Sequence, residues 1–80
     1  MNAIFVLVKC ELGTAYDVAA DAVDTIEEVS EVYSISGPYD LLVKCYLKPD
    51  EDPGRFVTSH IQRLKNVKDT QTIITFNAFT

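Results

Sequence analysis

Two short polar segments carry the side chains whose types suit recognition of a small ligand. The first is a Gly-Pro turn, in which Asp40 follows Gly37 by three residues at the mouth of an apolar run. The second is a Thr-x-Thr pattern, which places Thr70 and Thr72 on one face of a strand. A carboxylate can pair with an ammonium group, and backbone N–H groups and hydroxyls can hold a carboxylate. These groups together predict a site for a zwitterion such as an amino acid.

Each part of this pattern also has an ordinary structural explanation. Glycine followed by proline is common turn chemistry, and alternating threonine is common strand composition. The residues alone therefore leave an alternative open. The chain could be a structural or hetero-assembly module in which these polar side chains only set the alignment of a subunit interface.

Residues for catalysis or metal binding are few. His60 is the only histidine, and it shares a face of an expected helix with Phe56 and Leu64. No neighbouring nucleophile or acid marks it as catalytic, so we expect a packed or rim histidine. No second histidine completes a metal site, and no glycine-rich phosphate loop is present. We expect no enzyme, no metal and no cofactor, with a small dimeric α/β-barrel enzyme such as a monooxygenase as the least favoured alternative.

The charge balance excludes several classes of partner. Seven basic against twelve acidic residues give a net charge of −5, whereas nucleic-acid binding needs a basic face.

The apolar N-terminal run is too short to span a bilayer and lacks the basic flank of a signal peptide. Cys10 and Cys45 lie in strand-like runs rather than in a metal or disulfide pattern. We therefore expect a cytoplasmic chain with two buried free thiols and no direct contact with nucleic acid or membrane.

The elements that must position these groups form one domain over residues 1–80. Branched and aromatic residues predict a strand at 3–10, and Thr14 with Asp17 predicts a capping-box-like start to a helix. The expected apolar stripe of that helix is Ala15, Ala19, Ala22, Val23 and Ile26. Strands at 30–36 and 39–47 flank the Gly-Pro turn.

A second helix and a last strand complete the pattern. Asp52 is the expected N-cap and Pro53 the first helical residue, and Asn66 suits a left-handed C-cap. The expected buried face of this helix is Phe56, Val57, Ile61 and Leu64, and the last strand is expected at 68–78. The order β-α-β-β-α-β predicts an α+β, ferredoxin-like sandwich, with a four-stranded antiparallel sheet and two helices on one face.

Both faces of the expected sheet are apolar, although two helices cover only one. One face carries Ile4, Val6, Val8, Cys10, Leu41, Val43, Cys45 and Leu47, and the other carries Ala3, Phe5, Leu7, Leu42 and Tyr46. The uncovered face exceeds what soluble monomers usually expose, so we expect a homodimer formed sheet to sheet, a dimeric α/β barrel. The alternative is a face that is merely rich in tolerated surface hydrophobes.

Three segments of the chain resemble the ligand-binding (RAM) domain of the Lrp/AsnC, or feast/famine, regulators. They are AIFVLVKCELG, EVSEVYSISGPYDLLVKCY and RFVTSHIQRLKNVKDTQTIIT. The middle segment matches the family signature at Val29, Glu31, Tyr33, Ile35, Ser36, Gly37, Tyr39 and Asp40. The last matches G-V-x-x-T-x-T at Val67, Thr70 and Thr72. It departs from it at Asn66, where glycine is usual, and Glu27 stands where a proline often precedes the second strand.

This resemblance implies a function and a set of partners. It implies sheet-to-sheet dimers, often assembled into rings, and small effectors, typically amino acids, bound where dimers meet. The implied effector-binding residues are Ser36, Gly37, Tyr39, Asp40, Thr70 and Thr72. The chain resembles a stand-alone form of the domain without the helix-turn-helix DNA reader. It is therefore expected to act in transcription control by modulating full-length regulators of the family.

Overall fold

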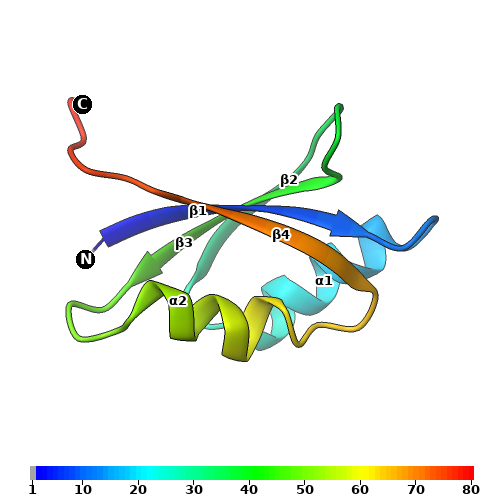
Figure 1. The fold of residues 1–80 in the computed structure, drawn as a ribbon, viewed down its shortest axis with the longest axis horizontal. Coiled ribbons are helices and arrows are strands. Elements are labelled where there is room, and N and C mark those ends of the chain that lie inside the picture. Colours follow the sequence, from blue (N-terminus) through cyan, green and yellow to red (C-terminus); the bar gives the residue numbers. More distant parts are fainter. Residues whose placement is uncertain (1) are drawn as a thin grey trace.

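A computed structural model describes residues 2–80 as a single sheet with two helical segments beneath it (Figure 1). The elements in chain order are β1 (Asn2–Cys10), α1 (Ala15–Thr25), β2 (Val29–Ser34), β3 (Leu41–Leu47), α2 (Pro53–Phe56) with its π-helical continuation (Val57–Ile61), and β4 (Val67–Ile74). None of the helices in these residues is long and apolar enough to cross a bilayer.

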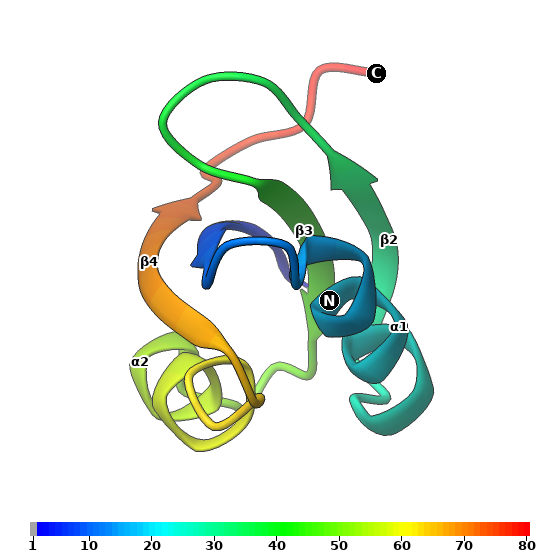
Figure 2. The ribbon, with the colours of Figure 1, turned by 90° about the vertical axis from the view of Figure 1, so that its right-hand side faces the viewer.

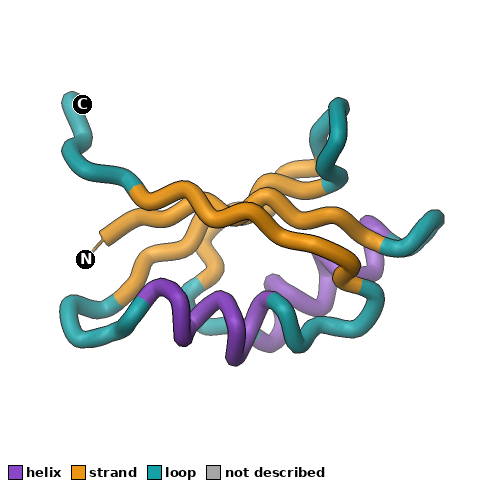
Figure 3. The backbone as a smooth tube through the Cα atoms, viewed as in Figure 1, coloured by secondary structure: helices purple, strands orange, loops and turns teal. Residues whose placement is uncertain are grey.

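The sheet has the strand order β2-β3-β1-β4, and every neighbouring pair is antiparallel. Both helical segments lie on one face, with α1 under the β2 side and α2 under the β4 side (Figure 2). The opposite face, called the open face below, carries no helix (Figure 3). The predicted ferredoxin-like architecture is confirmed.

The core lies between the sheet and the helices. The two central strands send alternate side chains into it, and the register sets Val6 of β1 directly opposite Val43 of β3. The buried core residues of the sheet are Ile4, Val6, Val8, Cys10, Leu41, Val43, Cys45 and Leu47, all of which the alternation predicted. The helix-facing half of the sheet is therefore complete within one chain.

The first helix begins where predicted but differs in detail. Val18, Ala22 and Ile26 are buried, at the four-residue spacing of one helix face. Val23 was wrongly placed in the stripe, because it lies about 100° around the helix from Ala22 and is 60 % exposed. The capping-box prediction is also wrong, since the Thr14 hydroxyl donates to an upstream carbonyl and makes no cap hydrogen bond.

The predicted start and buried face of the second helix are confirmed. Asp52 Oδ2 accepts a hydrogen bond of 2.8 Å from the N–H of Arg55, and Pro53 is the first helical residue. Three of its four predicted core residues are buried and Leu64 is half-buried. The regular helix ends earlier than predicted, at Ile61, and a turn leads to Asn66, which has φ +70 and so adopts the predicted left-handed conformation.

Two strands end earlier than predicted. The second stops at Ser34, and a loop containing Gly37 (φ +108) leads to β3. The last stops at Ile74, which pairs with Ile4 near the beginning of β1. The residues that follow therefore have little of β1 left to pair with, and they leave the sheet (Figure 1).

Candidate ligand-binding site

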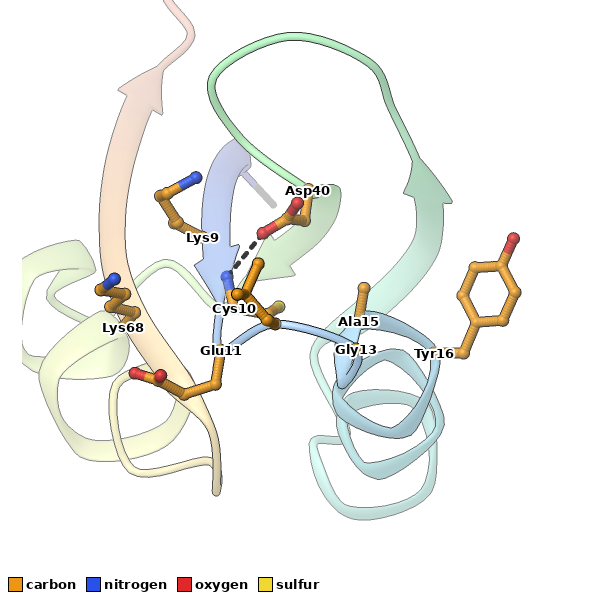
Figure 4. A pocket seen from close by; sticks show the side chains of 9 residues that line it. Lys9, Cys10, Glu11, Gly13, Ala15, Tyr16, Asp40 and Lys68 are labelled. Carbon is orange, nitrogen blue, oxygen red and sulfur yellow. Dashed lines mark hydrogen bonds between the residues drawn. The ribbon is translucent and has the colours of Figure 1, made fainter.

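Asp40 makes three hydrogen bonds at the end of the β1–β3 ladder. Its N–H donates to the Val8 carbonyl at 2.9 Å, and its own carbonyl accepts from Ile35 N–H at 3.0 Å. Its side-chain Oδ2 accepts from the N–H of Cys10 at 2.8 Å (Figure 4). The carboxylate thereby caps β1 where its pairing with β4 shifts register between Lys9 and Cys10. The acid is an integral part of the sheet end rather than a loosely solvated turn residue.

A cavity of about 350 Å³ lies beside this carboxylate. Gly13, with φ +77, allows the chain to turn sharply between β1 and α1 around it. The lining residues come from the end of β1, the following loop, the first turn of α1, the end of the β2–β3 loop and the start of β4 (Figure 4). They are Lys9, Cys10, Glu11, Leu12, Gly13, Ala15, Tyr16, Asp40 and Lys68. This volume falls at the small end of the range for ligand pockets and suits a molecule of amino-acid size.

The cavity combines charges of both signs with apolar wall. Lys9 and Lys68 supply ammonium groups, while Asp40 and Glu11 supply carboxylates. Lys9 Nζ also donates to the Pro38 carbonyl at 3.2 Å, which ties the β2–β3 loop to this end of the sheet. Among residues 2–80 the hydrogen bonds of Asp40 use only Oδ2 of its carboxylate. Its Oδ1 is thus available to a cationic group, and the lysines are available to an anionic one.

Burial keeps both thiols protonated. Burial raises the pKa of Cys10, and the nearby charge of Asp40 raises it further. Burial likewise raises the pKa of Cys45 to about 12, with Glu28 adding to the effect. Cys45 pairs with Ile4, at the far end of β1 from Cys10, so the predicted separation of two free thiols is confirmed. A neutral thiol is neither a nucleophile nor a metal ligand.

The two threonines of the Thr-x-Thr pattern lie on the helix side of the sheet. Thr70 and Thr72 pair with Val8 and Val6 of β1, whose side chains are buried against the helices. The Thr70 hydroxyl accepts from Gln62 Nε2 at 2.8 Å and borders a separate hollow of about 320 Å³. Both threonines share one face, as predicted, but within one chain they lie outside the candidate cavity.

The remaining expected site residues lie in and beside the β2–β3 loop. Ser36 and Gly37 are exposed in this loop. Tyr39 is half-buried, and its hydroxyl donates to Gln71 Oε1 at 3.2 Å on the open-face side of β4. One chain therefore brings only Asp40, of the six expected residues, to the candidate cavity.

The cavity contains residues that the sequence patterns did not single out, chiefly Lys9, Glu11 and Lys68. A usable signal existed in the expected topology. Because β1 and β4 are antiparallel neighbours, the start of β4 lies beside the end of β1, and the register sets Lys9 opposite Asp69. This pairing predicts that Lys68, one residue before Asp69, lies next to the glycine turn.

His60 lies on the surface of the π-helical continuation of α2, as expected for a packed or rim histidine. Its ring stacks on Phe56 with centroids 5.1 Å apart, and its Nδ1 lies 3.2 Å from the Phe56 carbonyl oxygen. The part of the chain that the structure describes contains no cluster of three acidic, thiol or imidazole groups suited to a metal ion. The imidazole is a packing group on the helix surface.

This architecture, with a mixed-charge cavity at a strand end, is that of a small α+β ligand-binding domain. The family model described as the Lrp/AsnC ligand binding domain matches residues 3–80, and the chain belongs to this family. The predicted resemblance is confirmed, and it places the chain with ligand-binding domains of transcriptional regulators rather than with enzymes.

Individual relatives support the same placement. The HTH-type transcriptional regulator FL11 of Pyrococcus abyssi is 36 % identical over 70 residues, which cover 88 % of this chain and 45 % of FL11. The chain thus spans about half the length of the regulators it matches in sequence. The chain is also similar to TTHA0845 from Thermus thermophilus, for which a crystal structure is known. The two sequences are 34 % identical, and the folds match with a TM-score of 0.86 over 100 % of this chain and 99 % of that one.

A more distant likeness shows the fold alone. The transcriptional regulator NMB0573 of Neisseria meningitidis, solved as a complex with L-Met, is 19 % identical with a TM-score of 0.82. The match covers 99 % of this chain and 52 % of that one.

Proposed function

We propose that residues 1–80 act as a single amino-acid-binding and oligomerisation domain in transcription control. The observation that carries this proposal is the fixed carboxylate of Asp40 beside a cavity of about 350 Å³ that also contains Lys9 and Lys68. The L-Met complex of NMB0573 supports it, because methionine is a zwitterion of the proposed class.

The cavity suggests a binding mode for such a zwitterion. The ligand ammonium pairs with Asp40 Oδ1, while Oδ2 stays bonded to the Cys10 N–H and keeps the acid in place. The ligand carboxylate pairs with the ammonium of Lys68, and its side chain lies against the apolar wall at Leu12 and Ala15. Charge of both signs at one site favours zwitterions over simple anions or cations.

The proposal includes assembly of the chain. Two copies pair through their open faces, which carry exposed apolar side chains such as Tyr33 and Ile73. Dimers then meet in a ring, where Ser36, Gly37 and Tyr39 of the loop, and Thr70 and Thr72, are contributed to the effector site partly by neighbouring chains. A net charge of −5 does not favour contact with DNA by this domain. It acts in the cytoplasm on DNA-binding regulators of its family.

Titration calorimetry with a panel of amino acids tests the binding proposal. The informative variant is Asp40→Asn, because an amide oxygen still accepts the Cys10 N–H bond while the negative charge is lost. We expect the wild type to bind at least one amino acid and Asp40→Asn to bind it at least about tenfold more weakly. Asp24→Asn removes an exposed acid of α1 that does not line the cavity, and it should bind like the wild type. Absence of wild-type binding, or undiminished binding by Asp40→Asn, overturns the assignment.

A purely structural role is the second candidate, because the Asp40 carboxylate already caps the sheet end. In that case Asp40→Ala changes the oligomer size in light scattering, and amino acids leave the size of the wild-type assembly unchanged. A ligand-dependent change in the size of the wild-type assembly contradicts this second candidate.

A further inference from the structure

The residues after β4 form an arm (residues 75–80) that carries two phenylalanines and lies apart from the core. The Thr75 hydroxyl donates to the Ala3 carbonyl at 2.5 Å and anchors the base of the arm. Beyond it, Phe76 and Phe79 are each 94 % exposed. The arm rises on the side of the sheet opposite the helices (Figures 1 and 2). Two fully exposed phenylalanines are costly in water and call for a covering surface.

A hollow of about 420 Å³ lies at the base of this arm, on the open face. Its floor is an aromatic cup formed by Phe5, Lys44 and Tyr46. Lys44 Nζ lies 6.0 Å from the Phe5 ring centroid and 5.0 Å from that of Tyr46. Rings and a cation in this arrangement suit further aromatic side chains, through stacking and cation–π contact.

The arm does not fill the cup of its own chain. Residues 75–78 and Thr80 form one wall of the hollow, yet the side chains of Phe76 and Phe79 are each 94 % exposed. The arm, Thr-Phe-Asn-Ala-Phe-Thr, carries no ionisable side chain, so no side-chain charge opposes entry of its phenylalanine rings into the cup. The arm therefore borders the cup of its own chain but fills it with neither phenylalanine ring.

We propose that the arm of each chain packs into the aromatic cup of a second copy, so that the two copies exchange arms. This proposal rests on the open-face pairing of the proposed function and deepens it. Five residues beyond Thr75 can span about 17 Å when extended, whereas packed sheets lie about 10 Å apart. The arm therefore reaches across the interface to the sheet of a facing chain.

The arm and the cup lie at the same end of the sheet. Arm exchange therefore requires one particular orientation of the two-fold axis of the dimer. A two-fold axis running along the strands sets both arms and both cups at one end of the dimer. Each arm then lies over the other chain's cup, so both cups are filled and no arm is left over. A two-fold axis across the strands would instead bring each arm to the β2–β3 loop of the other chain.

Sedimentation velocity on the full chain tests the contribution of the arm. We expect the double substitution Phe76→Ser and Phe79→Ser to raise the dimer dissociation constant at least about tenfold, since each phenylalanine buries a large apolar area. Val23→Ser removes an exposed apolar side chain from α1, away from the open face, and should leave the dissociation constant unchanged. Equal dissociation constants for the wild type and the double variant overturn the arm exchange.

A second measurement locates the arm. Asn77→Cys chains without 15N are modified with a nitroxide spin label and mixed with 15N-labelled wild type. Both native thiols are buried, so the spin label attaches to the introduced thiol. We expect broadening of the Phe5, Lys44 and Tyr46 amide signals in the 15N chain. Broadening at the β2–β3 loop, or none in an intact dimer, overturns arm exchange while leaving open-face pairing standing. A wild type that is monomeric at high concentration overturns both.

Discussion

The two faces of the sheet are made by the same strands, yet one chain completes only one of them. On the helix side, Ile4, Val6 and Val8 are at most 1 % exposed. On the open side, Tyr33 is 50 % and Ile73 is 43 % exposed. The helix side therefore buries its apolar residues within a single chain, whereas the open side leaves apolar surface that the proposed dimer would cover.

The largest effect is expected on the helix side. Ile4→Ala removes three buried carbons from the core and should lower the free energy of unfolding by about 2–5 kcal/mol. Urea denaturation measures this loss. A loss below about 1 kcal/mol would mean that the core collapses around the site or that Ile4 is less buried than the structure shows.

A substitution on the open side should weaken association while leaving the fold intact. Leu42→Glu places a charge among apolar open-face neighbours and should raise the dimer dissociation constant about a hundredfold or more. Sedimentation velocity gives the constant, and circular dichroism checks that the variant is folded. Val23→Glu is the matched control, because it introduces the same charge at an exposed position of α1 and should leave the dissociation constant unchanged. If Leu42→Glu dimerises like the wild type, the open faces are not the interface.

The smallest expected effect is a pH dependence of stability that arises from the helix side alone. Burial raises the pKa of Cys45 to about 12, whereas its neighbour Lys44 lies on the open side. Below about pH 9 the thiol is protonated in both the folded and unfolded states. Between about pH 9 and 12 it ionises only in the unfolded chain, so the free energy of unfolding falls as pH rises.

The contribution of Cys45 is isolated by comparison with Cys45→Ala. Urea midpoints measured from pH 7 to 10.5 should fall more steeply for the wild type than for this variant, because only the wild type has the buried thiol. All other ionisable groups are common to the two proteins, so their contributions cancel in the difference. Parallel pH profiles would show that the thiol is accessible to solvent in the folded state.

Much of the fold was predictable because it depends on local patterns. Strict alternation along β1 and β3 identified every buried strand position of the core, and Asp52-Pro53 marked the start of α2. The misplacement of Val23 has a physical cause. An alanine-rich helix offers several apolar stripes of similar width, and only contact with the sheet selects the one through Val18.

The candidate site was less predictable because it depends on contacts between distant segments. Asp40 was identified from its place after the turn, but its bond to the Cys10 N–H links residues 30 positions apart. Lys68 reaches the cavity only because β4 lies next to β1. The expected contribution of Thr70 and Thr72 to an effector site shared with neighbouring chains stays a prediction.

The alternation along β1 separates two kinds of evolutionary constraint within one short segment. Even-numbered residues such as Ile4 and Val6 face the core, while odd-numbered residues such as Phe5 and Leu7 face the open side. A change at one set alters whether the chain folds, and in the proposed open-face dimer a change at the other alters which chain it pairs with. Gene duplicates of such a domain can therefore diverge into separate assemblies through every second position of one strand, without redesigning the protein interior.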